Sequence, residues 1–158
     1  MGPTAAPDAS PKRIPQSLVA LACCPRRPAV SMPDVHVVIL AAGKGTRMKS
    51  SLPKVLHNLA GQRLLEYALR TAEELSPQSL TLVLGHMAET IKQAVAGRRG
   101  VQVVVQEPQL GTGHALLQAA SVLKNASGAL LLLSADVPLL KAETLRRLCL
   151  AHERALPR

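Results

Sequence analysis

Two glycine-containing segments and one isolated aspartate hold the residues of this chain that could carry out chemistry. The first segment, AAGKGTR (41–47), contains Gly43 and Gly45, where the backbone can turn sharply and bring its amides close to a ligand. Arg47 and the nearby Lys54 add positive charge, and an arginine can hold phosphate oxygens through two parallel hydrogen bonds. The spacing matches neither a Walker A motif nor G-x-G-x-x-G. Glycines alone would indicate an ordinary turn, but with these two cations the segment predicts a phosphate-binding loop.

The second segment, QEPQLGTGHA (106–115), has the residue types that bind a nucleobase. Gln106 and Gln109 carry amides, which can donate to and accept from the edge of a base. Glycines on both sides of Thr112 allow the loop to wrap around a flat or phosphorylated ligand. We interpret His114 as a polar residue at a helix start, with a role as acid or base as the alternative.

Asp136 follows the apolar run ALLLLS (129–134) and has no other carboxylate beside it. A single carboxylate facing a phosphate-binding loop suits Mg²⁺, a hard ion that prefers oxygen ligands and substrate phosphates. The alternative role, capping the next helix, is less well supported because residues 137–139 intervene. The sequence therefore favours a magnesium site at Asp136.

These residues need a scaffold, and from Asp34 onward short apolar runs alternate with amphipathic stretches. Strands are expected over 35–41, 79–85, 101–106 and 129–134, and helices over 62–75, 87–96, 114–124 and 142–154. Such alternation predicts a mainly parallel sheet between helices, a Rossmann-like three-layer α/β/α sandwich. In these folds ligands bind beyond the carboxyl ends of the strands, which is where both loops and Asp136 fall.

The composition limits the range of partners. The formal charge is +9, but the basic residues are scattered in pairs such as Arg98–Arg99, typical of solvated surface, and Trp and Phe are absent. A basic phosphate pocket accounts for the charge, and we expect no nucleic-acid partner. No apolar run approaches the roughly 18 residues that span a bilayer, so no membrane partner is expected. Cys23, Cys24 and Cys149 form no spaced framework, which is typical of a cytoplasmic protein.

We expect two regions along the chain. Residues 1–33 contain seven of the twelve prolines and no clean period, which predicts a disordered N-terminal extension. The apolar piece SLVALACC (17–24) is short and poorly flanked for a signal peptide. Residues 34–158 are expected to form the folded domain.

Taken together, LAAGKGTRMKSSLPKVLHNLAG, QEPQLGTGHA and ADVPLL resemble the sugar-phosphate nucleotidyltransferases. The resemblance covers about residues 35–152 and is strongest to the N-terminal uridylyltransferase part of the bacterial bifunctional enzymes that make UDP-N-acetylglucosamine. It implies a nucleotide-diphospho-sugar transferase fold. It also implies that a sugar 1-phosphate oxygen attacks the α-phosphorus of UTP and releases pyrophosphate, with Mg²⁺ as cofactor.

The resemblance also assigns roles. It implies catalytic roles for Arg47 and Lys54, a Mg²⁺ ligand in Asp136, and nucleotide contacts from Leu40, Ala41, Ala42, Gly43, Lys54, Gln106, Gln109, Gly111 and Thr112. This sequence has Ser134-Ala135 where relatives commonly have Tyr-Gly before the aspartate, and Gln62-Arg63 where Lys-Pro is common.

The family's domain continues beyond the equivalent of Arg158, with the sugar-binding residues and a second metal ligand in that part. We therefore expect residues 34–158 to be the nucleotide-binding part of a truncated domain, which leaves the acceptor sugar and the oligomeric state open. Two alternatives remain: a nucleotide-binding module without catalysis of its own, and a related enzyme with another nucleotide or acceptor. Gln106 within its motif favours uracil.

Overall fold

The computed structural model describes residues 32–43 and 45–155 of the chain. Of the region 1–33, for which the sequence predicts disorder, only the last two residues fall within this range. Lys44, inside the first glycine-containing loop, also lies outside the described residues. The described part alternates strands and helices, as predicted.

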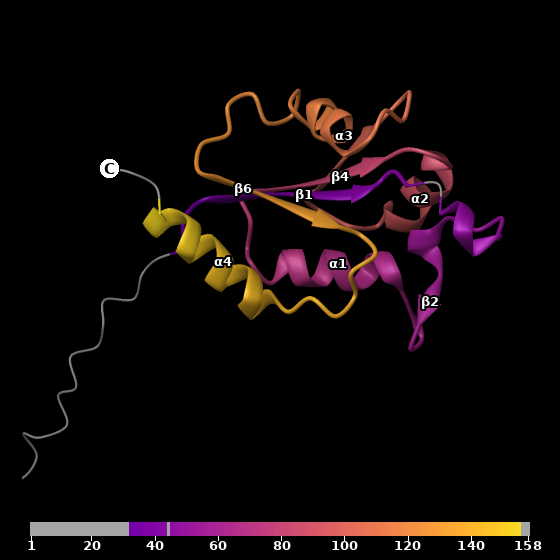
Figure 1. Ribbon diagram of the computed structural model, residues 1–158, viewed down its shortest axis with the longest axis horizontal. Coiled ribbons are helices and arrows are strands. Elements are labelled where there is room, and N and C mark those ends of the chain that lie inside the picture. Colours follow the sequence, from indigo (N-terminus) through magenta and orange to yellow (C-terminus); the bar gives the residue numbers. More distant parts are fainter. Residues whose placement is uncertain (1–31, 44, 156–158) are drawn as a thin grey trace, which may run out of the picture. The chain divides into compact units, whose positions relative to one another are not determined.

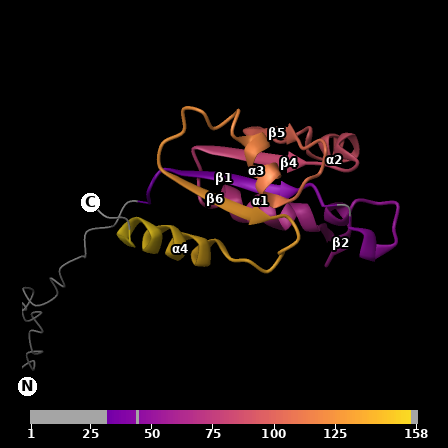
Figure 2. The same cartoon turned by 45° about the horizontal axis from the view of Figure 1, so that its top comes forward.

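Four parallel strands form the central sheet, in the order β5-β4-β1-β6 (Figures 1 and 2). They are β1 (Val35–Ala41), β4 (Ser79–Leu84), β5 (Val101–Val105) and β6 (Ala129–Ser134). From β1 the chain builds first toward β4 and β5 on one side and then returns to place β6 on the other. The strand order therefore reverses at β1, and a ligand crevice is expected beyond its carboxyl end.

Helices cover both faces of the sheet, which confirms the predicted three-layer α/β/α sandwich. One face carries α1 (Leu64–Glu73), α2 (Ala88–Val95) and α4 (Ala142–Ala155), and the other carries α3 (Thr112–Ala119) (Figure 1). None of the helices in the described range has an apolar stretch long enough to cross a bilayer.

The alternating side chains of β1 build a core on each face of the sheet. Val37 and Ile39 are 1% and 0% exposed and pack with α1, including Leu69, whereas Val38 faces Ala119 of α3. Full burial of an aliphatic side chain of this size contributes about 1.5–3 kcal/mol. The run VHVVILA is almost continuously apolar because both of its faces are covered.

β6 is an edge strand, and its two faces are buried unequally. Leu131 and Leu133 pack in the core on the face with three helices. Leu130 and Leu132 are 46% and 39% exposed on the face that carries α3 alone. Four consecutive leucines contain no alternation from which this difference could be predicted.

The first helix is shorter than expected. It begins at Leu64 rather than at residue 62, because Gln62–Arg63 form strand β3 and pair with β2 (Asn58–Leu59). Ala60 and Gly61 between these strands have φ values of 48° and 82°, the positive values that a two-residue hairpin turn requires.

α3 occupies residues 112–119 instead of the expected 114–124. It starts earlier because Gly111, with φ of 102°, turns the chain directly into the helix. It ends earlier because later bonds, such as Val122 N–H to the Ala119 carbonyl, close tighter turns. The residue expected in a loop, Thr112, therefore lies in the first turn of the helix.

Thr81 in β4 carries an unpaired hydroxyl. The side chain is 0% exposed and lies beside Val38 on the α3 face, and its Oγ1 has no hydrogen-bond partner within the described residues. We expect Thr81→Val to raise the free energy of unfolding by about 1 kcal/mol, because it removes a buried unpaired polar group. Urea denaturation of both chains measures the change. A less stable valine variant would show that the hydroxyl is paired after all.

Candidate functional site

Two cavities open side by side at the carboxyl end of β1. The larger, of about 540 Å³, lies between the loop after β1, the short 3₁₀ helices η2 (Thr46–Met48) and η3 (Lys54–Leu56), and the end of β6. The smaller, of about 330 Å³, lies between the loop after β1 and the segment 106–115. Leu40, Gly43 and Ser134 line both cavities, so one elongated ligand can occupy the two together.

Every residue for which the sequence predicts a binding or catalytic role lines one of these cavities. The larger contains Leu40, Ala41, Gly43, Arg47, Lys54 and Asp136, and the smaller contains Leu40, Ala42, Gly43, Gln106, Gln109, Gly111 and Thr112. The register explains why Asp136 comes close, because Leu40 at the end of β1 pairs with Ser134 of β6. Three segments far apart in the sequence thus meet where the strand order reverses.

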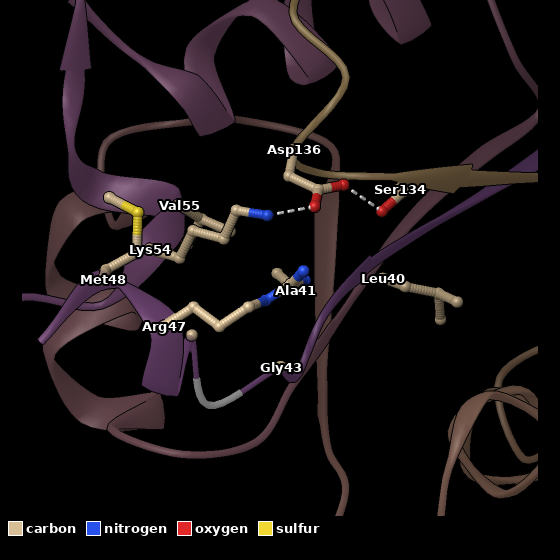
Figure 3. Close-up of a pocket in the computed structure, with 10 residues that line it drawn as sticks. Leu40, Ala41, Gly43, Arg47, Met48, Lys54, Val55, Ser134 and Asp136 are labelled. Carbon is tan, nitrogen blue, oxygen red and sulfur yellow. Dashed lines mark hydrogen bonds and ion pairs between the residues drawn. The ribbon is translucent and has the colours of Figure 1, made fainter.

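Lys54 and Asp136 form an ion pair across the larger cavity (Figure 3). The Lys54 Nζ lies 2.5 Å from Oδ2 of Asp136, and Ser134 donates its hydroxyl to the other carboxylate oxygen. The hydrogen bond from Lys54, followed by that from Ser134, lowers the pKa of Asp136 below its ordinary value. The carboxylate is therefore held ionised, as a cation ligand must be.

Sequence reasoning assigned Lys54 and Asp136 to separate roles and found no partner for Ser134. The available signal was a hydroxyl residue two positions before the aspartate, at the end of the same strand. Ala135 between them is 1% exposed and packs in the core. Its methyl group therefore points away from the cavities and does not obstruct a ligand there.

Local sequence explains how Lys54 reaches the cavity. Pro53, with φ of −53° and ψ of 137°, leads into η3, where Val55 and Leu56 are buried and anchor the turn. Gly45, with φ of 61°, lies directly against this turn, since a Cβ at Gly45 would be 2.9 Å from the Cβ of Lys54. A side chain at Gly45 would push the glycine-containing loop and Lys54 apart.

Arg47 extends from η2 into the same cavity, toward the end of β1 at Ala41 (Figure 3). The residue as a whole is exposed to solvent. The cavity therefore receives two cationic side chains, Arg47 and Lys54, and one carboxylate, Asp136. This set can hold a polyanion together with a metal ion.

In the smaller cavity the amide group of Gln106 is engaged within the protein. Gln106 is 4% exposed, and its Nε2 donates to the carbonyl oxygen of Gly111 at 2.9 Å and lies 3.1 Å from Nδ1 of His114. An amide nitrogen has two N–H groups, and both are engaged when Nδ1 of His114 carries no proton. In place of the expected two-way pairing, Gln106 offers a ligand its oxygen.

Gly85, just after β4, lets the loop after β1 and the segment 106–115 pack closely at the end of this strand. A Cβ at this position would lie 2.6 Å from Nε2 of Gln109 and 2.7 Å from the carbonyl oxygen of Ala42. The glycine thus allows both walls of the smaller cavity to approach the end of β4. The sequence predicts Gly85 only as the last residue of the strand 79–85 and contains no signal of these contacts.

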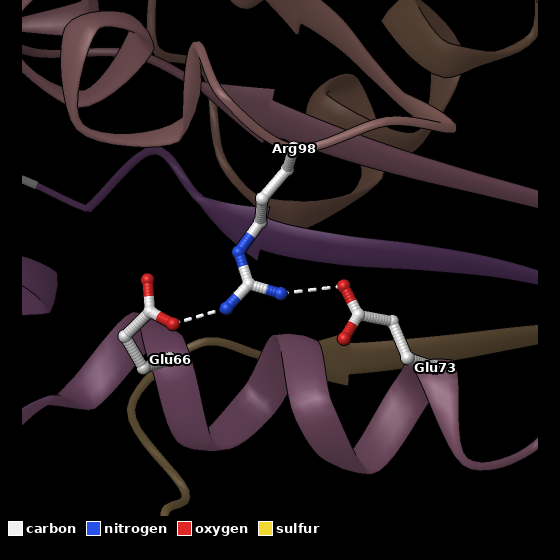
Figure 4. A network of polar contacts seen from close by, with 3 residues as sticks. All are labelled: Glu66, Glu73 and Arg98. Carbon is white, nitrogen blue, oxygen red and sulfur yellow. Dashed lines mark hydrogen bonds and ion pairs between the residues drawn. The ribbon is translucent and has the colours of Figure 1, made fainter.

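Another charged cluster, whose residues line neither cavity, serves the fold. Arg98, expected as solvated surface, is 23% exposed at its side chain and bonds to Glu73 at 2.5 Å and to Glu66 (Figure 4). The two glutamates are seven residues apart on α1, so they share one helix face. The arginine ties the end of α2 to α1 and takes no part in the cavities.

The site has one carboxylate, which fits a metal ion that takes its other ligands from a substrate and from water. Among residues 32–43 and 45–155, no three or more histidine, cysteine or acidic side chains gather as a complete metal-binding group. Asp136 would therefore supply one oxygen ligand, with phosphate and water oxygens completing the shell. Mg²⁺ is commonly bound in this way.

The lowered pKa of Asp136 predicts how the ion pair affects stability. In the acid range the folded chain binds fewer protons than the unfolded chain, so the free energy of unfolding falls as the pH falls. The contribution is complete above the ordinary pKa of 3.8 and is lost as the pH drops through the lowered value. Urea denaturation should show a stability gap between this chain and Asp136→Asn that is constant from about pH 7 to about pH 5 and narrows below about pH 4. A stability gap that closes near pH 6 would show that it does not arise from the ionisation of Asp136.

Comparisons with known proteins give a consistent set of relatives. A family model described as MobA-like NTP transferase domain matches residues 37–156. The bifunctional protein GlmU of Synechococcus sp. (strain RCC307) is 51% identical over 116 residues, which are 73% of this chain and 26% of that protein. The bifunctional protein GlmU of Albidiferax ferrireducens is 51% identical over 123 residues, which are 74% of this chain and 26% of that protein.

Among solved structures, Rv0371c from Mycobacterium tuberculosis H37Rv, in complex with manganese, matches with a TM-score of 0.64 and 26% identity. The match covers 77% of this chain and 60% of that one. The chain spans about a quarter of the length of the curated relatives that it matches.

Proposed function

The chain belongs to the family of MobA-like NTP transferase domains, and from this membership we propose that it transfers UMP from UTP to N-acetylglucosamine 1-phosphate. The products are UDP-N-acetylglucosamine and pyrophosphate. The observation that carries the proposal is the pair of adjoining cavities, one with two cations and a carboxylate and the other lined by amides. The resemblance of the three motifs to uridylyltransferases supports the choice of nucleotide and acceptor.

In this proposal the uracil lies in the smaller cavity and the phosphates lie in the larger one. Gln106, Gln109 and the start of α3 at Gly111 and Thr112 surround the base. The backbone from Leu40 to Gly43 runs between the cavities, beside the ribose and the α-phosphate. Arg47 and Lys54 contact the phosphates.

The chemistry requires charge stabilisation more than a covalent nucleophile. An oxygen of the sugar 1-phosphate forms a bond to the α-phosphorus of UTP, and the bond from that phosphorus to the oxygen bridging to the β-phosphorus breaks. The bridging oxygen leaves with pyrophosphate. Arg47 and Lys54 donate hydrogen bonds to phosphate oxygens, which gain negative charge in the transition state.

Lys54 has to exchange partners for this role. Without a ligand it neutralises Asp136, and with UTP it would turn to the phosphates. A divalent cation held by Asp136, Mg²⁺ in this proposal, would neutralise phosphate charge. The relative solved with manganese supports a divalent metal for the family.

A second candidate function is nucleotide binding without turnover by this chain. The observation that favours it is length, because the chain covers 26% of its bifunctional relatives. A related transferase that uses another nucleotide or acceptor is a further alternative. The order of the affinities for UTP, CTP and GTP tests whether the chain prefers another nucleotide.

We also propose a cytoplasmic location. Cys23, Cys24 and Cys149 form no spaced disulfide framework, which supports a reducing compartment. Nucleic acids and membranes are not partners in this proposal.

The experiment combines calorimetry with a pyrophosphate assay on the purified 158-residue chain. We expect UTP to bind in the presence of Mg²⁺ and more tightly than CTP or GTP. Release of pyrophosphate that requires both UTP and N-acetylglucosamine 1-phosphate would support transfer and rule out the module. UTP binding without release would support the module, and the absence of UTP binding would contradict both candidates.

A further inference from the structure

A line of side-chain contacts runs from Gln106 through His114 to Gln118. Gln106 Nε2 contacts the carbonyl oxygen of Gly111 and Nδ1 of His114, at 2.9 and 3.1 Å. The other ring nitrogen of His114, Nε2, lies 3.0 Å from Nε2 of Gln118. His114 lines neither cavity, so it contacts Gln106 from behind the wall that a ligand would meet.

The direction of these hydrogen bonds is fixed at one end by the backbone. The carbonyl oxygen of Gly111 can only accept, so the atom of Gln106 beside it is the amide nitrogen. The second N–H of that nitrogen points to Nδ1 of His114, which must then accept and carry no proton. The ring proton sits on Nε2, and a 180° rotation of the Gln118 amide places its oxygen there as the acceptor.

This arrangement leaves Gln106 as an acceptor toward the smaller cavity. Because the residue is 4% exposed, water does not readily replace a partner that a ligand fails to supply. Uracil has an N–H at position N3 and can donate to the oxygen. Cytosine has a bare nitrogen there, so two acceptors would face each other. The two pyrimidines are nearly equal in size, and hydrogen-bond polarity rather than shape has to separate them.

We propose that His114 is a positioning residue: its unprotonated Nδ1 holds the Gln106 amide with the oxygen toward the base and thereby sets a preference for UTP over CTP. The inference rests on the proposed function, in which this cavity receives the base. It is compatible with the position of His114 in the first turn of α3 and is an alternative to a role as acid or base. The ring touches no ligand and acts through Gln106.

The test measures dissociation constants of UTP and CTP, each with Mg²⁺, by calorimetry on the full chain. In His114→Ala the second N–H of Gln106 loses its acceptor, so only the Gly111 carbonyl still opposes a turn of the amide that would offer an N–H to the base. We expect the ratio of the CTP to the UTP dissociation constant to fall about tenfold, the value of one hydrogen bond. In His114→Asn the side-chain oxygen can take the place of Nδ1, so the ratio should return to within about threefold of the original.

Leu117→Ala is the matched control, because Leu117 lies on the same helix and is 70% exposed. It should leave both constants unchanged. If His114 had a purely structural role, His114→Ala would weaken the binding of UTP and CTP equally and leave the ratio of their dissociation constants unchanged. That result would overturn the inference. An asparagine variant that is folded by circular dichroism but shows the alanine variant's ratio would overturn it too. If the unaltered chain binds neither nucleotide, the proposed function fails and the inference falls with it.

Discussion

Alanine in place of Gly85 should weaken UTP binding by about a hundredfold or more, since both walls of the smaller cavity pack against this residue. The added Cβ would lie 2.6 Å from Nε2 of Gln109, 2.7 Å from the backbone oxygen of Ala42 and 2.9 Å from the Ala42 Cβ. A side chain such as Gln109 can move aside. The backbone at Ala42 cannot do so without shifting the loop after β1.

The effect is steric, which makes a clean control available. Neither Gly85 nor Gly97 has a positive φ, so backbone strain does not distinguish the two positions. An added Cβ at Gly97, however, would have no atom within 4 Å. Gly97→Ala should therefore bind UTP as the unaltered chain does. Calorimetry gives the affinities, and circular dichroism shows that the variants are folded. Undiminished UTP binding by a folded Gly85→Ala would mean that the two walls do not hold the ligand between them.

Asparagine in place of Asp136 should abolish the dependence of UTP binding on Mg²⁺. The carboxylate is the protein's oxygen ligand in the proposed metal site, and a neutral amide binds Mg²⁺ poorly. The same change frees Lys54, which is 2.5 Å from Asp136 in the absence of a ligand. Metal-free UTP binding should therefore stay equal or become tighter. Calorimetric titration of UTP with Mg²⁺ and with a chelator separates the two effects.

Lys54→Met is the complementary variant. It should weaken UTP binding about ten- to a hundredfold with or without metal, because a charge-assisted hydrogen bond to phosphate is worth about 1.5–3 kcal/mol. Ser134→Ala, which removes only the hydroxyl on Asp136, should reduce the Mg²⁺ effect by a few-fold, roughly the value of one neutral hydrogen bond. If Asp136→Asn retained the full Mg²⁺ effect, the metal would lie elsewhere.

The sequence was sufficient to predict the scaffold and the clustering of the candidate residues at one end of the sheet. The strand VHVVILA (35–41) is apolar on both faces, and only a central strand of a covered sheet requires that. Placing loops at the carboxyl ends of parallel strands then brings Gly43, Gln106 and Asp136 together without knowledge of their distances.

The contacts between these residues could not be predicted, because they depend on register and packing. The pairing of Leu40 with Ser134 decides that the hydroxyl faces the cavity while Ala135 faces the core. In the sequence Gly85 is an ordinary strand end. Its importance follows only from the fold, in which the loops containing Ala42 and Gln109 both pack against it. The unequal burial of β6 likewise follows from its position at the edge and from the single helix on one face.

The most direct test of the central claim is to locate bound UTP by the amide chemical shifts of the full chain. If the nucleotide spans both cavities, UTP with Mg²⁺ should shift the amides of Gly45, which lines only the larger cavity, and of Gly111, which lines only the smaller one. The amide of Gly128, at the opposite end of the sheet beside Asp34, should remain in place. Shifts confined to the region of Gly128, or to only one of the two cavities, would contradict the proposed site.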